Sequence, residues 1–255
     1  MFNYTTILEV KISTLSRAEV LSSISQFLVD EHQHQIFTPN PEMLVKARSD
    51  AYFKKVLNGS DLNLCDGRGL QFFSVLPLKR LTGTDFVPEL AKIAAETEQS
   101  IFLLGSYQNN AAERAGQKLV ELCPGLLVVG SDKGPAISED PVSGALIINQ
   151  AENQAVIDKI NLTKPAILLV AFGMGKQEKW IYENLGKLPS VKIAMGVGGA
   201  FNYLAGFARR APCWMRQIGL EWLYRVLHEP ERLLRILTAT VTFTWFAAQE
   251  RYGKK

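Results

Sequence analysis

The stretch that decides the fold is Ile167-Leu-Leu-Val-Ala-Phe172, followed by Gly173-Met-Gly175, Lys176-Gln-Glu-Lys-Trp-Ile-Tyr-Glu-Asn-Leu185 and Val191-Lys-Ile-Ala-Met195. It reads as an apolar strand, a glycine turn, an amphipathic helix and a second apolar strand. Continuous apolar strands of this length are typical of parallel sheets that are buried on both faces. This stretch therefore predicts one strand–helix–strand unit of a parallel sheet.

The same alternation extends in both directions along the chain. The predicted strands cover residues 5–12, 36–38, 61–65, 101–104 and 126–129. The predicted helices cover residues 16–29, opened by the capping box Ser16-Arg-Ala-Glu19, and residues 41–57, 109–122 and 153–161. We therefore expect an α/β fold with a Rossmann-like, mostly parallel sheet and helices on both faces, plus a C-terminal helical appendage.

Composition and charge divide the chain in two. The whole chain of 255 residues carries +3, and residues 207–255 hold nine Lys and Arg against four Asp and Glu, or +5, which leaves −2 for residues 1–206. Residues 236–248 lack any charge, yet thirteen residues fall short of the roughly twenty that cross a bilayer. We predict an α/β catalytic domain over 1–206 and a basic, aromatic, membrane-proximal appendage over 207–255 that lies on a membrane surface.

The remaining composition narrows the class of protein and its location. Cys65, Cys123 and Cys213 form no CxxC pair and have no clustered histidines to complete a zinc site, so we expect reduced cysteines and a cytoplasmic location. The amino terminus lacks the features of a signal peptide. No Asp-x-Asp pair is present to chelate a metal on a diphosphate, which favours metal-independent chemistry without a cofactor. We expect no nucleic-acid partner.

Three predicted strands end in glycine turns, at 105–106, 173–175 and 196–199. In parallel sheets, ligands gather at the carboxyl ends of strands, and glycine lets the backbone approach a phosphate. None of these turns is a GxGxxG fingerprint or a Walker loop. A nicotinamide-dependent oxidoreductase therefore stays an alternative, although the chain lacks the GxGxxG fingerprint expected of that class.

Short motifs spread over nearly the whole chain: Thr38-Pro-Asn40, Asp66-Gly-Arg-Gly69, Arg80-Leu-Thr-Gly-Thr-Asp85, Leu104-Gly105, Gly173 to Trp180, Gly196 to Gly206, Arg209-Arg-Ala-Pro212 and Glu221 to Arg235. Taken in this order, they resemble the WecG/TagA/CpsF family of bacterial glycosyltransferases. Two positions depart from the family pattern: Gly175 stands where the family usually has proline, and Asn202 where it usually has aspartate.

The resemblance implies transfer of an N-acetylmannosamine-type sugar, or a related hexose, from a UDP donor to a polyprenyl-diphosphate-linked sugar. Inversion at the anomeric carbon is expected, in the synthesis of a cell-surface polysaccharide such as teichoic acid or exopolysaccharide. The implied location is the inner face of the plasma membrane. The protein could also form a homo-oligomer. The alternatives are a non-catalytic partner of another glycosyltransferase and a non-enzymatic protein that binds a membrane or a partner.

Within this resemblance, Asp66 is the candidate catalytic base. It follows a predicted buried strand and could accept the proton of the acceptor hydroxyl, although Asp-Gly is also an ordinary turn dipeptide. Thr38 and Asn40 lie at another strand end, where they could bond a sugar or the base. The alternative is that they only cap the loop.

Other residues are candidates for binding substrate. Arg80 could hold the donor diphosphate, or be a surface arginine paired with Asp85. Gln177 could reach sugar hydroxyls or uridine, whereas Glu178 in a first helical turn could be only a favourable dipole contact. The backbones of four glycines could approach the diphosphate, or the glycines could serve tight packing: Gly105, Gly196, Gly198 and Gly199.

The arginines of the tail complete the set of candidates. Arg225, Arg232 and Arg235 would share one face of a continuous helix, although Pro230 more readily starts a new one. They could hold the diphosphate of the donor or of the lipid carrier. A solvated basic face and attraction to anionic lipid are the alternatives.

Overall fold

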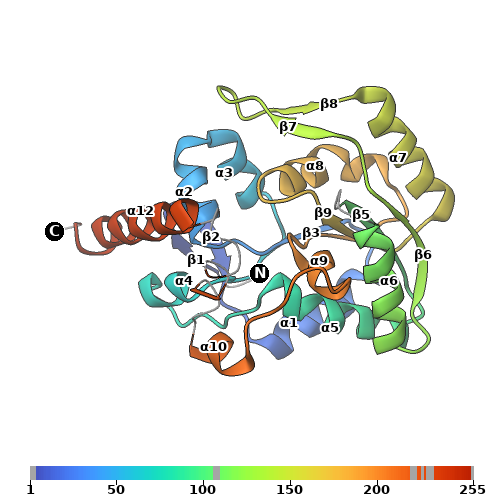
Figure 1. Cartoon of the computed structure of the whole chain (residues 1–255), viewed down its shortest axis with the longest axis horizontal. Coiled ribbons are helices and arrows are strands. Elements are labelled where there is room, and N and C mark those ends of the chain that lie inside the picture. The colour runs from blue at the N-terminus through green and yellow to red at the C-terminus, as the bar shows by residue number, and fades with distance from the viewer. Residues whose placement is uncertain (1–3, 106–109, 219–222, 225–226, 228–232, 254–255) are drawn as a thin grey trace.

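The computed structural model describes residues 4–105, 110–218, 223–224, 227 and 233–253. Its centre is a six-stranded sheet in the order β4-β3-β10-β9-β5-β6, in which every neighbouring pair is parallel (Figure 1). The expected α/β fold is confirmed. The strands are β3 His34–Phe37, β4 Leu62–Asn63, β5 Ser100–Gly105, β6 Leu127–Asp132, β9 Ile167–Ala171 and β10 Ile193–Gly196.

Helices connect these strands and cover the sheet, and two short hairpins lie outside it. The hairpins are β1 Tyr4–Ile7 with β2 Val10–Ser13, and β7 Ile137–Glu139 with β8 Leu146–Ile148. The helices are α1 Arg17–Phe27, α2 Pro41–Ser49, α3 Ala51–Asn58, α4 Arg68–Phe73, α5 Gly83–Glu96, α6 Ala111–Leu122, α7 Gln150–Thr163, α8 Lys176–Asn184, the 3-10 turn η1 Leu185–Lys187, α9 Ala200–Leu204, α10 Cys213–Ile218 and α12 Leu233–Tyr252.

Alternation along the buried strands creates two cores, one on each face of the sheet. In β9, Ile167 and Leu169 face one core, whereas Leu168 and Val170 face the other. The first core is shared with α1, α5, α6 and α9, and the second with α2, α3, α7, α8 and the β1–β2 hairpin. Both faces of the sheet are buried under helices, which is why the sequences of these strands are unbroken apolar runs.

Two predicted elements are divided in the structure. The single strand expected over 5–12 is the β1–β2 hairpin, which turns at Leu8 and Glu9 with φ of 48° and 64°. Neither residue is a usual turn former, so the sequence carries no signal for this turn. The single helix expected over 41–57 is divided at Asp50, whose carboxylate caps α3 by accepting the Phe53 N–H at 2.8 Å. The prediction also lacked α5, β7 and β8.

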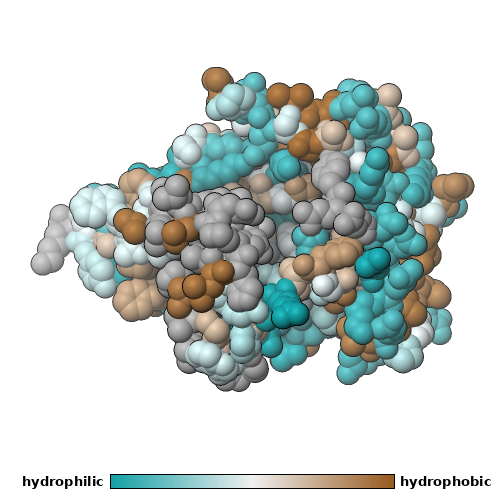
Figure 2. Space-filling view, viewed as in Figure 1, coloured by the Kyte–Doolittle hydropathy of each residue, from teal (hydrophilic) through white to brown (hydrophobic). Residues whose placement is uncertain are grey.

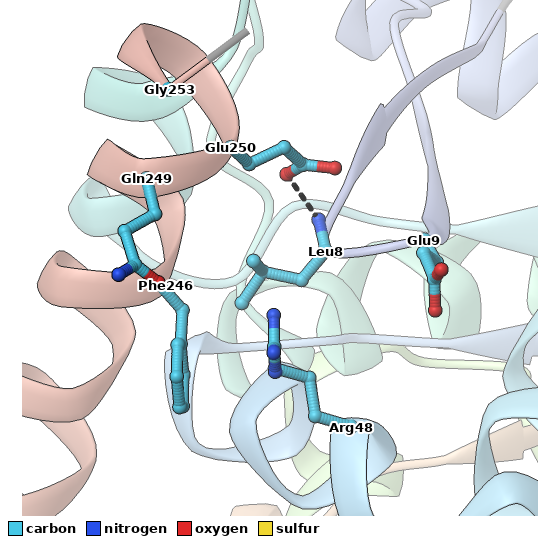
Figure 3. A pocket seen from close by; sticks show the side chains of 7 residues that line it. All are labelled: Leu8, Glu9, Arg48, Phe246, Gln249, Glu250 and Gly253. Atoms are coloured by element: carbon cyan, nitrogen blue, oxygen red, sulfur yellow. Dashed lines mark hydrogen bonds between the residues drawn. The ribbon is translucent and has the colours of Figure 1, made fainter.

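The C-terminal helix α12 packs against α2 and α4 and contributes to the second core through Phe243 and Ala247 (Figure 1). Figure 3 shows its last turns beside a cleft of about 370 Å³, where the Glu250 carboxylate accepts the Leu8 N–H at 2.7 Å. The Arg48 guanidinium stacks 4.0 Å from the centre of the Phe246 ring in the same cleft. Within the part of the chain that the structure covers, no helix combines the length and hydropathy needed to span a membrane.

Candidate functional site

The candidate residues gather at one edge of the sheet because β3, β4, β5, β9 and β10 are parallel and end on the same side. Beyond the ends of β3 and β4, the two following segments stay side by side and remain hydrogen-bonded. The Leu64 N–H donates to the Phe37 carbonyl at 2.8 Å, and the Asp66 N–H donates to the Pro39 carbonyl at 2.9 Å. The segment that carries Asp66 is therefore fixed beside the segment that carries Thr38 and Asn40.

The turn after Asp66 is held by close packing. Gly67 has φ of +148°, and a Cβ there would lie 2.9 Å from Cδ of Pro41, so this position requires glycine. Burial, with a smaller contribution from the Asp66 carboxylate, raises the pKa of the neighbouring Cys65 thiol to about 12, although the Gly67 carbonyl and the Arg80 guanidinium oppose the shift. The Leu81 N–H donates to the Cys65 carbonyl at 2.9 Å, so the segment that carries Arg80 lies beside the segment that carries Asp66.

Thr38 and Asn40 have different surroundings. The Asn40 side-chain oxygen accepts the Met43 N–H at 3.0 Å and caps α2, as the capping alternative predicts. Thr38 is buried, and its hydroxyl would lie 3.4 Å from a Cβ built on Gly83, at the start of α5. The same Cβ position is 3.7 Å from the Val197 carbonyl. Thr38 therefore packs between α5 and the turn after β10.

Gln177 and Glu178 form a buried pair that reaches that turn. The Gln177 amide oxygen accepts the Gly198 N–H at 3.0 Å, and its Nε2 donates to the Glu178 carboxylate at 2.7 Å. The other carboxylate oxygen of Glu178 accepts the Gly175 N–H at 2.7 Å. Burial raises the pKa of Glu178 to about 7, although these hydrogen bonds favour the charged form. Glu178 thus orients Gln177, and Gln177 holds the turn.

The four candidate glycines differ in what surrounds them. A Cβ on Gly105 would lie 2.7 Å from the Ala171 backbone, and one on Gly196 would lie 2.9 Å from Nε2 of Gln177, so both positions are closed by packing. A Cβ on Gly198 would meet nothing within 4 Å, and one on Gly199 would meet only Tyr203 at 3.9 Å. Open space for the approach of a ligand to the backbone exists only at the last two of these four positions.

Two arginines hold Asp85 at the start of α5, and a third, Arg80, is bonded to one of them. The Asp85 carboxylate pairs with Arg210 at 2.6 Å and with Arg216 at 3.3 Å, and it accepts the Thr82 hydroxyl at 2.7 Å. Burial alone would raise the pKa of Asp85, but the hydrogen bonds from Arg210 and Thr82 outweigh it and hold the pKa below its usual range. Arg80 donates to the Arg216 carbonyl at 2.8 Å. The proposed pairing of Asp85 with Arg80 is therefore wrong, because Arg210 and Arg216 hold Asp85.

The structure describes no side chain of the three candidate arginines in the tail. Arg225 and Arg232 lie outside the described residues, and Arg235 lies in α12 without a described side chain. Their expected role at a diphosphate stays a prediction. The sequence interpretation used Arg209 to Pro212 as a landmark but gave Arg210 and Arg216 no role, since nothing local connects them to Asp85.

A second charged cluster lies around Lys179 in α8, and the sequence interpretation missed it. Lys179 is wholly buried, and its Nζ donates to Asp50 at 2.6 Å, Glu139 at 2.7 Å and the Gly144 carbonyl at 2.6 Å. Lys46 pairs with the same Glu139 at 2.5 Å. These bonds join α2, α8 and the β7–β8 hairpin. A cluster of three or more potential metal ligands does not occur among the residues with described positions.

Gly175 departs from the family pattern for a visible reason. Its φ is +84°, which proline cannot adopt, and a Cβ there would lie 2.4 Å from Nζ of Lys46. The turn between β9 and α8 thus leaves room for the Lys46–Glu139 pair. Asn202 lies in α9, and its carbonyl accepts the N–H groups of Phe207 and Ala208 at 2.9 and 3.1 Å.

Comparison with known proteins agrees with the fold and with the motifs. The sequence model described as "Glycosyl transferase WecG/TagA/CpsF family" matches residues 5–255. Similar curated proteins include three from Staphylococcus aureus, of strains MRSA252, MW2 and NCTC 8325 / PS 47, each named N-acetylglucosaminyldiphosphoundecaprenol N-acetyl-beta-D-mannosaminyltransferase. Each is 29% identical over 255 residues, which cover 98% of this chain and 94% of the relative.

Proposed function

The chain belongs to the WecG/TagA/CpsF family of glycosyltransferases, and from this premise we propose that it transfers an N-acetylmannosamine-type sugar to a polyprenyl-diphosphate-linked sugar. The names of the similar proteins support this sugar and this acceptor. The proposed donor is the UDP-sugar. The observation that carries the proposal is the meeting of Asp66, Thr38 and the open Gly198-Gly199 backbone with three arginines at one edge of the sheet.

In the proposed reaction Asp66 is the base. The acceptor hydroxyl oxygen attacks the anomeric carbon, its proton passes to Asp66, and the bond from that carbon to the UDP oxygen breaks. Attack from the face opposite UDP inverts the configuration. The Asp66 carboxylate is part-buried beside the segment 38–40, which suits a base that must reach one substrate hydroxyl.

The departing UDP gains negative charge, and the arginines are its proposed counter-charges. Arg80, Arg210 and Arg216 lie together with the carboxylate of Asp85 at this site, and their guanidinium groups are the proposed partners of the diphosphate oxygens. Guanidinium groups bind diphosphate oxygens in pairs, and they can supply the stabilisation that other transferases take from Mg²⁺. The open backbone at Gly198 and Gly199 would offer a second approach to the diphosphate. The transfer is accordingly proposed to be independent of metal.

The lipid carrier of the acceptor explains the proposed location at the inner face of the plasma membrane. Along α12, the exposed side chains of Val241, Trp245 and Tyr252 project from the side opposite the buried Phe243 and Ala247. An apolar, aromatic helix face next to basic residues suits the interface of a membrane. We propose that residues 207–255 form the membrane-proximal appendage.

The transfer reaction tests the proposal directly. Purified protein is incubated with UDP-N-acetylmannosamine and a polyprenyl-diphosphate-N-acetylglucosamine analogue, with and without EDTA, and the product is identified by mass spectrometry. Asp66→Asn should lower kcat by about 10²–10⁴-fold, the usual contribution of a general base. Asp158→Asn, at an exposed carboxylate on α7, is the matched control and should keep full activity. A folded protein that transfers none of the common UDP-hexoses would refute the proposed chemistry.

A further inference from the structure

The end of α4 and the loop that follows it, residues 72–79 and here called loop 72–79, present large apolar side chains to solvent. Phe72 is 71% exposed, Val75 80% and Leu76 46%, all within five residues. Three exposed apolar residues this close together on a soluble surface mark a contact with another molecule. This loop, residues 72–79, was assigned no role by the motifs of the sequence.

The loop is ordered by its own hydrogen bonds, so the exposure belongs to its folded form. The Ser74 hydroxyl donates to the Leu76 carbonyl at 2.5 Å, and the Gln71 side chain donates to the Leu78 carbonyl at 2.8 Å. Leu78 itself is buried in the core. These carbonyls are thus already hydrogen-bonded, and moving the loop into an apolar medium does not leave them without partners.

The loop adjoins the last turn and the buried side of α12. Arg251 donates to the Phe72 carbonyl at 2.8 Å, and the Phe73 ring packs edge-on against Phe243 with 5.7 Å between ring centres. Figure 2 shows hydrophobic side chains on the surface at the end of the molecule where Figure 1 places α4 and α12. Two segments far apart in the sequence therefore lie side by side, and both carry exposed apolar side chains on the surface.

The charges around this surface are positive. Residues 67–84 contain Arg68, Lys79 and Arg80 but no Asp or Glu. In α12 the only acidic residue is Glu250, and its carboxylate points to the Leu8 N–H and not to the outer face. Exposed apolar side chains that have basic residues, and no outward-facing acidic residue, in residues 67–84 and α12 fit a bilayer that contains anionic lipid.

We propose that loop 72–79 is a second membrane-inserting element, which enters an anionic bilayer beside α12. The proposal rests on the proposed function and deepens it by defining how the catalytic edge faces the membrane. Only residues 68–71 of α4 separate this loop from Gly67, which is about 6 Å along the helix at 1.5 Å per residue. Insertion of the loop would therefore hold Asp66 close to the headgroup region, where the diphosphate of a lipid-linked acceptor lies.

Vesicle binding tests the proposal. Full-length wild type, Val75→Asp and the matched control Val142→Asp are sedimented with vesicles of phosphatidylglycerol and phosphatidylcholine. Val142 is 95% exposed on the β7–β8 hairpin, far from the loop in sequence. Val75→Asp should weaken partitioning at least about tenfold, the effect of losing one buried valine side chain, and Val142→Asp should change it less than about twofold. Phe72→Ser should weaken partitioning in the same direction.

Transfer assays separate this inference from the proposed function. Val75→Asp should reduce transfer to an acceptor embedded in vesicles while leaving transfer to a water-soluble short-chain acceptor unchanged. If Val75→Asp binds vesicles as tightly as wild type does, the inference is wrong. It is also wrong if folded wild type binds no vesicles. A wild type that transfers to neither acceptor refutes the proposed function, whereas the sedimentation result still decides whether the loop inserts.

Discussion

Gly196 and Gly199 lie in the same turn, yet alanine should have opposite effects at the two positions. At Gly196 a Cβ would lie 2.9 Å from Nε2 of Gln177 and 3.2 Å from its Cγ and Cδ. Gln177 is 3% exposed, and hydrogen bonds to the Gly198 N–H and the Glu178 carboxylate hold its side chain in place. At Gly199 the nearest atom is 3.9 Å away and φ is −81°, an ordinary value for alanine.

The expected loss of stability follows from the two hydrogen bonds of Gln177. Displacing this side chain breaks two hydrogen bonds. One is the part-buried bond that the Gly198 N–H donates to Gln177, and the other is the buried bond that Gln177 donates to Glu178. A buried polar group left unsatisfied costs about 1–3 kcal/mol, so Gly196→Ala should lower the free energy of unfolding by about 2–4 kcal/mol. Gly199→Ala should leave it unchanged or raise it by up to about 1 kcal/mol, because alanine restricts the unfolded chain.

Urea unfolding followed by tryptophan fluorescence measures the first effect, since Trp180 is buried in the core. Calorimetric titration with UDP measures the second. If the backbone at Gly199 approaches the diphosphate, Gly199→Ala should weaken UDP binding at least about tenfold without loss of stability. Equal stability of Gly196→Ala and wild type would refute the reasoning, since it would show that Gln177 is not confined by the turn.

Two further predictions concern the buried charges. Because burial raises the pKa of Glu178 to about 7 from an ordinary 4.5, the stability that its protonated form contributes is complete below about pH 4.5 and is lost as pH rises through about 7. Urea unfolding between pH 5 and 8 should show wild type losing up to about 3 kcal/mol relative to Glu178→Gln, and a difference that is constant with pH would contradict this. Lys179→Met should cost about 3–5 kcal/mol by leaving the carboxylates of Asp50 and Glu139 without their buried partner. Lys118→Met, at an exposed ion pair, should cost less than about 1 kcal/mol, and similar losses in the two variants would count against the buried network.

Local patterns were enough to predict the frame of the fold. The unit from Ile167 to Met195 is a buried strand, a glycine turn, a helix and a buried strand in the structure, with bounds close to those expected. The capping box at Ser16 and Glu19 likewise begins α1. Elements without such patterns were missed: the β1–β2 turn has no glycine or asparagine, and α5 contains Pro88.

The candidate site could be predicted in part. The sequence placed Thr38, Asp66 and the turn at 196–199 at the ends of strands, and parallel pairing brings those ends together. Whether Asp66 is the base stays a prediction. That Gly196 serves packing whereas Gly199 borders open space could not be read from the sequence, because both are glycines of one motif.

The sequence by itself determined the parallel sheet, the family and the edge at which the candidates meet, because periodic burial and glycine turns are set by residues close together in the chain. Only the tertiary structure decided the partners. Asp85 pairs with Arg210 and Arg216, which are 125 and 131 residues away, and Phe72 accepts its hydrogen bond from Arg251, 179 residues away. Such contacts depend on how the helices pack around the sheet, and no local pattern encodes that choice.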